Sequence, residues 1–264
     1  MRRIPPLVLA AAAALLAAHP AAAQMQIPER FENLQILPKN IPRDTLVQIM
    51  RGFSASLGVR CSYCHVAREG QQGQYNWASD DKVEKRNART MMQMVRAINQ
   101  EHLPRLPERN NPPVNVTCLT CHRGLPVPTT LDRVLSAALD SGGTQAAIAR
   151  YRQLRETQMA SGRYDFSEGT LNELGRRLAT QGKTAEAAAL LELNAEFYPQ
   201  SGQVAFQLAE VYRTRGERDK AIVWYRMAQE KDPNNPQIAR RLQELTGTAP
   251  TPAPAPPSPP RPRR

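Results

Sequence analysis

The sequence CSYCH occupies residues 61–65, and the sequence CLTCH occupies residues 118–122. These two segments contain all four cysteines of the chain and two of its four histidines. CxxCH is the attachment motif of c-type haem. Thiols at positions i and i+3 project from one turn of helix and reach the two vinyl groups of one porphyrin, while the next residue points its imidazole at the iron. The sequence therefore predicts two covalently bound c-type haems. The predicted attachment residues are Cys61, Cys64, Cys118 and Cys121, and the predicted iron ligands are His65 and His122.

Three other kinds of chemistry use cysteine pairs. Exported thiols often oxidise to disulfides, four thiolates can bind zinc, and a CxxC pair can be redox-active. The disulfide and redox interpretations leave the histidine after each pair unexplained. A zinc site ordinarily needs its two pairs closer in sequence than the 57 positions between Cys61 and Cys118. Haem attachment is the interpretation that uses every residue of both motifs.

Residues 1–23 have the three parts of a secretory signal peptide. A basic start, formed by Arg2 and Arg3, precedes an apolar run over residues 7–18, and three alanines before Gln24 form a cleavage site. The apolar run is too short to span a bilayer comfortably, and it has no polar face that would suit a surface helix of a folded domain. We therefore expect an exported, soluble, periplasmic protein with no transmembrane segment in the mature chain.

The charge balance is basic, with 35 lysines and arginines against 24 acidic residues. The excess is typical of a solvated surface with a basic tail. The alternative is that it attracts a weakly acidic redox partner or an anionic membrane surface. Binding of nucleic acid is disfavoured by export and by the lack of a basic stretch interleaved with aromatic residues. An aromatic content of 5% and 23 prolines favour two small folded units with tails over one large core.

Each haem iron needs a sixth ligand, and a helical pattern that contains methionine precedes each motif. Before the first motif, apolar residues recur at helical spacing between Pro42 and Gly58, and Met50 lies among them. Before the second motif, the pattern predicts a longer helix that is capped by Ser79 and ends at Pro104. Methionine on a helix more often packs in a core, but beside a haem its soft thioether is a suitable iron ligand.

The second predicted helix carries three candidate methionines. At about 100° per residue, Met91 and Met94 lie about 60° apart on a stripe with Ile98, whereas Met92 lies about 160° from Met94. Either Met91 or Met94 can therefore be the sixth ligand of the iron. The sulfur of the one that does not bind iron should pack against the edge of the porphyrin ring. His102, near the end of this helix, matches no ligand position, and we expect it at the surface.

The region from Asn33 to Gly124 resembles one two-haem half of the photosynthetic reaction-centre cytochrome c subunit. Three segments carry the resemblance, namely NLQILPKNIPRDTLVQIMRGFSASLGVRCSYCHV, ASDDKVEKRNARTMMQMVRAIN and VTCLTCHRG. In that family each haem lies against a helix that provides methionine, followed by a turn and the CxxCH helix. The resemblance implies Met50 as the sixth ligand of the first haem and Met91 as that of the second, with Met94 as the alternative to Met91. Because that subunit carries four haems and this chain has two motifs, the resemblance implies a stand-alone relative used in periplasmic electron transport.

A 34-residue repeat follows the last motif. Gly182, Ala187 and Pro199 recur 34 positions later as Gly216, Ala221 and Pro233. This period is typical of tetratricopeptide repeats, although Asn194 replaces a small residue of the pattern in the first copy. Apolar spacing over residues 131–158 predicts one more helix pair. We expect these helices to dock a protein partner; the alternative is that they only pack against the haem unit and solubilise it.

The sequence thus predicts a mainly α fold with four segments. They are a signal peptide (1–23), a dihaem cytochrome c domain of helix-turn-CxxCH-helix units (24–130), a helical tetratricopeptide-like solenoid (131–247) and a disordered Pro-rich basic tail (248–264). The predicted function is electron transfer with a redox partner protein or a membrane electron-transport complex. A dihaem peroxidase, which needs one iron with an open position, and a repeat-based scaffold with redox-active haems are the alternatives.

Overall fold

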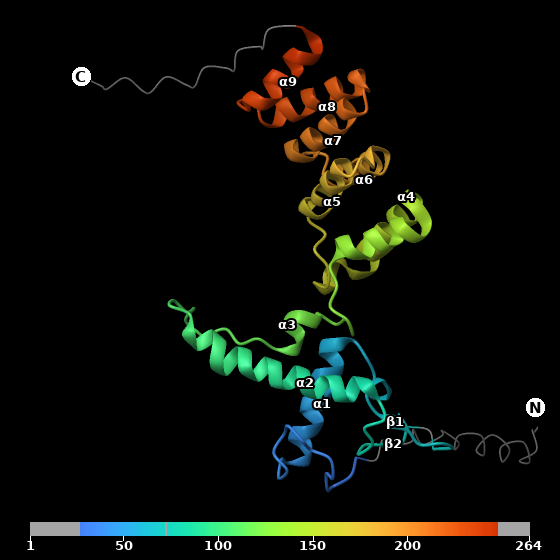
Figure 1. Ribbon diagram of the computed structural model, residues 1–264, viewed down its shortest axis with the longest axis vertical. Coiled ribbons are helices and arrows are strands. Elements are labelled where there is room, and N and C mark those ends of the chain that lie inside the picture. The colour runs from blue at the N-terminus through green and yellow to red at the C-terminus, as the bar shows by residue number, and fades with distance from the viewer. Residues whose placement is uncertain (1–26, 72, 248–264) are drawn as a thin grey trace, which may run out of the picture. The chain divides into compact units, whose positions relative to one another are not determined.

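A computed structural model describes residues 27–71 and 73–247 of the chain (Figure 1). The predicted mainly α fold is confirmed, because helices account for most of the described residues. The chain divides into two compact units, Met1–Val127 and Pro128–Arg264. The predicted signal peptide and Pro-rich tail lie outside the described residues. Within 27–71 and 73–247, we find no helix with the length and apolar character needed to cross a membrane.

The first unit combines helices with one short hairpin. Its elements are α1 (Arg43–Leu57), the 3-10 helix η1 (Cys61–Tyr63), strands β1 (Val66–Ala67) and β2 (Tyr75–Asn76), α2 (Val83–Ala97), the π-helical turn η2 (Ile98–His102), the 3-10 helix η3 (Leu103–Arg105) and α3 (Cys118–His122). Strands β1 and β2 pair antiparallel, with Val66 opposite Asn76 and Ala67 opposite Tyr75. The predicted helix before the first motif is confirmed as α1.

Helix α1 ends where the sequence predicted. Gly58 has φ 66° and ψ 31°, a left-handed conformation that glycine adopts without steric cost. The N–H of Gly58 donates to the carbonyl of Ala55 at 3.3 Å, and the N–H of Val59 donates to the carbonyl of Ser54 at 3.0 Å. These bonds close the helix and turn the chain directly into Cys61.

The predicted start of the second helix was wrong. Helix α2 begins at Val83, with Lys82 at the N-cap, rather than just after Ser79. The Ser79 hydroxyl instead donates to the carboxylate of Asp81 at 2.7 Å, and the N–H of Asp81 donates to the Ser79 hydroxyl at 3.1 Å. The side chain of Lys85 also donates to the carbonyl of Ser79 at 2.7 Å. These side-chain hydrogen bonds hold the residues before α2 in a non-helical turn, so the helix does not begin at Ser79.

The first unit has almost no apolar core of its own. Among its described residues, only Leu46 is buried, at 7% exposure. Its other large hydrophobic side chains are half-buried or exposed, and the exposed ones are Val83, Met91, Met94, Leu106, Val114, Leu119 and Val127. A folded unit of this size normally buries apolar side chains against each other. Protein side chains alone therefore do not complete this unit.

The second unit is a stack of helices with a continuous core. Its elements are α4 (Leu131–Gln158), the 3-10 helix η4 (Met159–Ser161), α5 (Glu168–Thr180), α6 (Thr184–Phe197), α7 (Gly202–Thr214), α8 (Arg218–Lys231) and α9 (Pro236–Thr246). From α5 onward, each helix packs on the next along the chain (Figure 1). Gly143, with φ 71°, breaks α4 into two helices, which confirms the predicted pair over 131–158.

The 34-residue period has a structural cause. Gly182 and Gly216 have φ 79° and 77° and make the turns between α5 and α6 and between α7 and α8. Asn194, the departure from the pattern, is fully buried on α6. Its amide donates to the carbonyl of Glu168 at 2.9 Å and to the side-chain oxygen of Asn172 at 3.0 Å, so the amide nitrogen is satisfied inside the core.

Candidate haem-binding sites

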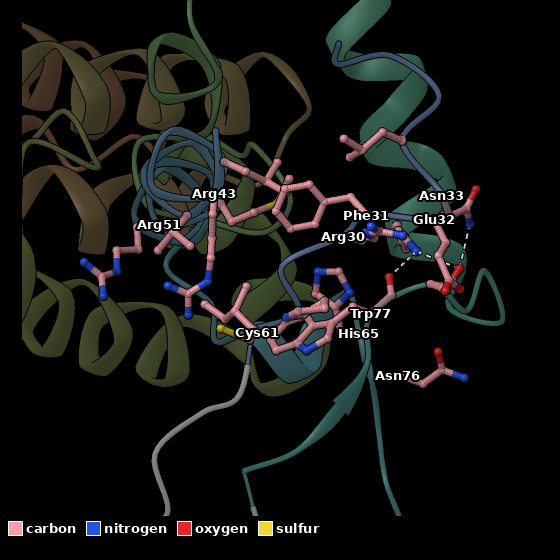
Figure 2. Close-up of a pocket in the computed structure, with 18 of the residues that line it drawn as sticks. Arg30, Phe31, Glu32, Asn33, Arg43, Arg51, Cys61, His65, Asn76 and Trp77 are labelled. Atoms are coloured by element: carbon pink, nitrogen blue, oxygen red, sulfur yellow. Dashed lines mark hydrogen bonds between the residues drawn. The ribbon is translucent and has the colours of Figure 1, made fainter. Parts of the chain in front are cut away.

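The first CxxCH motif lies beside a cavity of about 880 Å³ (Figure 2). Helix α1 contributes Leu46 and Met50 to its lining, and the motif contributes Cys61 and His65. The predicted ligands Met50 and His65 therefore line the same cavity, together with one of the two predicted attachment cysteines. Cys64, the other one, is half-buried one residue before His65. The volume is within the range of about 300–1,000 Å³ typical of cofactor pockets.

His65 is held by an aromatic neighbour. Its ring meets Trp77 edge-on, with centroids 4.8 Å apart (Figure 2). Trp77 in turn contacts Tyr75, with centroids 5.0 Å apart. Burial, assisted by the charge of Lys85, lowers the pKa of His65 to about 4. The imidazole is therefore neutral at pH 7, which is the form that binds a metal. Its Nδ1 atom is buried and has no hydrogen-bond partner in the described part of the chain.

A charged network fixes the loop that carries Trp77. The Asp80 carboxylate accepts two hydrogen bonds from the Arg89 guanidinium, at 2.8 and 2.9 Å, and lies 3.2 Å from the Lys85 ammonium. The Arg89 hydrogen bonds, with smaller contributions from Asn33 and Lys85, hold the pKa of Asp80 well below its usual range. Lys85 also donates to the carbonyl of Trp77 at 2.8 Å. Sequence reasoning did not identify this network, because its members are common surface residue types.

The second motif forms a short helix with a capped start. In α3, the Thr117 and Thr120 side chains complete a capping box. The Nδ1 atom of His122 lies 2.8 Å from the carbonyl oxygen of Leu125, and this contact assigns the proton to Nδ1. Nε2 is then the ring nitrogen with a free lone pair, as in metal-bound histidines whose other nitrogen donates to a backbone carbonyl.

Asn99 connects the second motif to the helix that carries the methionines. This residue lies in the π-helical turn η2 that follows α2. Its side chain donates to the carbonyl of Val116 and accepts from the N–H of Val116, both at 2.8 Å. Val116 is two residues before Cys118, so the two bonds tie the approach to α3 to the end of α2. Sequence reasoning missed Asn99, because one asparagine near a helix end is too common to be a signal.

The methionines of α2 differ in exposure as their angular positions predict. Met91 and Met94 are exposed at 44% and 47%, whereas Met92 is half-buried. Met91 and Met94 thus share a face of α2 that protein side chains leave open, and either thioether is accessible to a ligand. His102 is exposed in η2, as expected for a surface histidine.

Both motifs belong to one unit. The N–H of Gly124, just after α3, donates to the carbonyl of Ser56 near the end of α1 at 2.8 Å. Helix α1, which provides Met50 to the first site, therefore also anchors the end of the second motif. The arrangement positions two histidine-cysteine clusters and two methionine-bearing helices within residues 43–124.

The residues present fit covalently bound haem better than the other cysteine chemistries. All four cysteines are free of disulfide bonds. Across the described ranges, no three His, Cys, Asp or Glu side chains gather as a metal site, so a four-thiolate zinc site is excluded there. Burial raises the pKa of the Cys64 and Cys118 thiols, whereas reactive redox thiols have a lowered pKa. The near absence of an apolar core also fits a unit completed by a large apolar group.

The repeat unit carries an ionic cluster across its last three helices. Glu210 on α7 accepts from Arg213 at 2.7 Å, from Arg241 of α9 at 3.0 Å, and from the hydroxyl of Tyr225 on α8. Burial raises the pKa of Glu210, but these hydrogen bonds and charges outweigh it and leave the pKa lowered. The cluster fixes α7, α8 and α9 relative to each other and so keeps the faces of these helices rigid.

Comparison with known proteins confirms the resemblance in both parts of the chain. Residues 71–186 match the family model "Photosynthetic reaction centre cytochrome C subunit", and residues 178–245 match "Tetratricopeptide repeat". The first match includes the second CxxCH motif and begins after the first motif. It also extends beyond Gly124, where the resemblance noted from the motifs ended.

Two curated relatives are similar over about a third of the chain. The photosynthetic reaction center cytochrome c subunit of Thermochromatium tepidum is 37% identical over 103 residues, which are 38% of this chain and 22% of the relative. Cytochrome c-554 of Chloroflexus aurantiacus is 34% identical over 94 residues, which are 36% of this chain and 20% of the relative. The chain thus matches about a fifth of the length of each. A solved structure titled MamA AMB-1 covers 44% of this chain and 61% of its own at 19% identity, with a TM-score of 0.31.

Proposed function

We propose that the protein is a periplasmic dihaem c-type cytochrome that transfers electrons, and that its helical repeats dock a protein partner. The observation that carries the proposal is the presence, in one unit, of two CxxCH motifs that each follow a methionine-bearing helix. The similarity to two cytochromes supports a c-type haem protein over about a third of the chain. The tetratricopeptide match supports a role in protein interaction.

The residues have defined roles in this proposal. The attachment residues would be Cys61 and Cys64 for the first haem and Cys118 and Cys121 for the second. The iron ligands would be His65 and Met50 at the first haem, and His122 and Met91 at the second, with Met94 as the alternative to Met91. When bound, each haem supplies a one-electron couple at its iron. The protein's part is to orient the ligands: Trp77 backs one imidazole, and the carbonyl of Leu125 fixes the tautomer of the other. A thioether opposite an imidazole raises the reduction potential relative to two imidazoles.

Haem content can be tested by the mass of the denatured protein. Purified from cells competent in c-type cytochrome maturation, the chain should carry two haem masses on residues 24–264. Replacing Cys61 and Cys64 by alanine should remove one haem, and replacing Cys118 and Cys121 should remove the other. A mass equal to residues 24–264 alone would falsify the proposal.

Carbon monoxide separates a carrier from an enzyme. We expect a carrier, because a methionine is available for the sixth position at each site. A dihaem peroxidase needs one iron with an open or displaceable position. The reduced protein should therefore show little change in absorption with carbon monoxide, and binding of one equivalent would favour the peroxidase alternative.

Docking through the repeats can be tested in the full chain. Gln203 on α7 and Arg240 on α9 are exposed side chains on the rigid part of the stack. The double variant Q203E/R240E should keep both haem spectra and lose binding to membrane vesicles from the source cells in a sedimentation assay. The double variant Q93E/R96E, which makes the same change of charge at exposed positions of α2, serves as the control. Unchanged binding of Q203E/R240E relative to this control would contradict docking through this part of the stack.

A further inference from the structure

Four arginines line the first cavity without an acidic partner. They are Arg30, Arg43, Arg51 and Arg68. Throughout the described ranges, none of these guanidinium groups makes a hydrogen bond or an ion pair. Some arginines elsewhere are paired, for example Arg176 with Glu173 at 2.6 Å. Others, such as Arg105 and Arg240, are exposed and make no ion pair within the described ranges, so the four differ from them in lining one cavity.

The lining as a whole carries an excess of positive charge. Its other cation, Lys85, is already matched by Asp80 at 3.2 Å. Its two carboxylates, Glu32 and Asp44, form no ion pair with the cavity arginines in the described residues. Clustered like charges repel one another, and their free energy falls when a carboxylate or phosphate enters between them. The cavity therefore favours an anionic group as part of whatever occupies it.

The positions of the arginines on α1 relate them to the predicted iron ligand. Arg43 lies seven residues before Met50, so the two side chains leave the helix only about 20° apart and about 10 Å apart along its axis. Arg51 directly follows Met50. Figure 2 shows Arg43 and Arg51 on one side of the cavity and Arg30 on the other. The face that presents the thioether thus also presents the guanidinium group of Arg43, while Arg51 lies about 100° around the helix and reaches the same cavity.

We infer that Arg43 and Arg51, with Arg30 across the cavity, bind the two propionate carboxylates of the first haem and raise its reduction potential. This inference rests on the proposed function. Guanidinium groups that neutralise the carboxylates would disfavour the more positive ferric state and so raise the reduction potential.

A spectroelectrochemical titration of the holoprotein tests this inference. The wild type should show two one-electron waves. In the double variant R43Q/R51Q, the reduction equilibrium constant of one wave should fall about tenfold, which is a shift of about 59 mV to lower potential, while the other wave moves less than half as far. Both arginines are exposed, so water screens their effect and the change stays within this range. Each single variant should give about a threefold fall, which keeps the test valid if the double variant fails to mature.

Two further variants complete the experiment. R105Q/R109Q removes the same charge from exposed positions outside the cavity lining and should move both waves equally and slightly. M91H replaces a thioether by an imidazole and should lower the potential of the wave that R43Q/R51Q leaves nearly unchanged, which assigns that wave to the second motif. The inference is overturned if M91H and R43Q/R51Q move the same wave or if R43Q/R51Q shifts the waves no more than R105Q/R109Q. A denatured mass with fewer than two haems would overturn the proposed function itself, and the inference with it.

Discussion

Replacing Asn99 by alanine should release the second motif from the end of α2. The amide group of Asn99 makes two hydrogen bonds of 2.8 Å to the backbone of Val116. Each such bond contributes about 1 kcal/mol, and leaving the half-buried N–H and carbonyl of Val116 without partners adds about 1 kcal/mol more. We expect a total cost of about 3 kcal/mol, which corresponds to a factor of about 100 in the equilibrium between the tied and the released state.

The consequence should be specific to one haem. Because Val116 leads into Cys118, release of the tie lets the second motif move relative to α2 and its methionines. Ligation of methionine sulfur to ferric iron gives a weak near-infrared absorption band. Asn99→Ala should lower the urea concentration at which the second haem's contribution to this band is lost. The contribution of the first haem should be lost at the same urea concentration as in the wild type.

Two variants control this measurement. Gln100 is the exposed neighbour of Asn99 in the same π-helical turn, so Gln100→Ala should leave the urea profile unchanged. Asn99→Asp keeps an acceptor for the N–H of Val116 and loses the donor to its carbonyl, and its effect should lie between those of the other two. If Asn99→Ala behaves like Gln100→Ala, or if the profile of the first haem shifts instead, the tie does not position the second motif.

Three other predictions concern the remaining sites. In the ferric protein, Met91→Ala should remove half of the near-infrared band and open one reduced iron to carbon monoxide, whereas Met94→Ala should shift the spectrum only slightly; the reverse pattern would move the ligand assignment to Met94. Arg89 lowers the pKa of Asp80, so the stabilisation from the Asp80 carboxylate should be fully present above the ordinary pKa of 3.8 and be lost as the pH falls further. The free energy of unfolding of Asp80→Asn, measured in urea, should therefore depend less on pH in the acid range than that of the wild type. Gly175→Ala places a Cβ 2.7 Å from a buried leucine and should lower the thermal midpoint of the repeat helices by circular dichroism at a cost of about 1–3 kcal/mol, whereas Gly169→Ala on the same helix, with its nearest atom at 3.6 Å, should not.

The sequence predicts features that depend on periodicity and on covalent spacing. Helix α1, the repeat helices and the left-handed turns at Gly182 and Gly216 follow from patterns that local sequence contains. Features that depend on hydrogen bonds from side chains to particular backbone groups could not be predicted. The start of α2 was wrong because Lys85 binds the carbonyl of Ser79 and draws the preceding turn away from the helix. The Asn99 tie to Val116 is of the same kind, since it spans 17 positions and involves backbone groups.

The strands β1 and β2 show a second limit of sequence reasoning. Each has two residues, which is too short for an alternating pattern to be recognised. Nevertheless the hairpin matters to the site, because Trp77 directly follows β2 and meets the ring of His65. The position of an aromatic side chain behind a predicted iron ligand therefore depends on a structural element that carries almost no sequence signal.

The two units obtain their stability from different sources. The repeat unit buries leucines, alanines and tyrosines along its whole length, with Tyr151 and Tyr225 fully buried. The first unit buries Leu46 alone among its described residues, and its organising contacts are polar: the Asp80 network, the Asn99 tie and the bond from Gly124 to α1. Hydrogen bonds of this kind contribute little net free energy each, so they orient segments more than they hold them together. Burial of a large apolar group against α1 and α2 would supply the missing hydrophobic free energy. Folding of the first unit should therefore be coupled to attachment of the haems that its cysteines are spaced to hold.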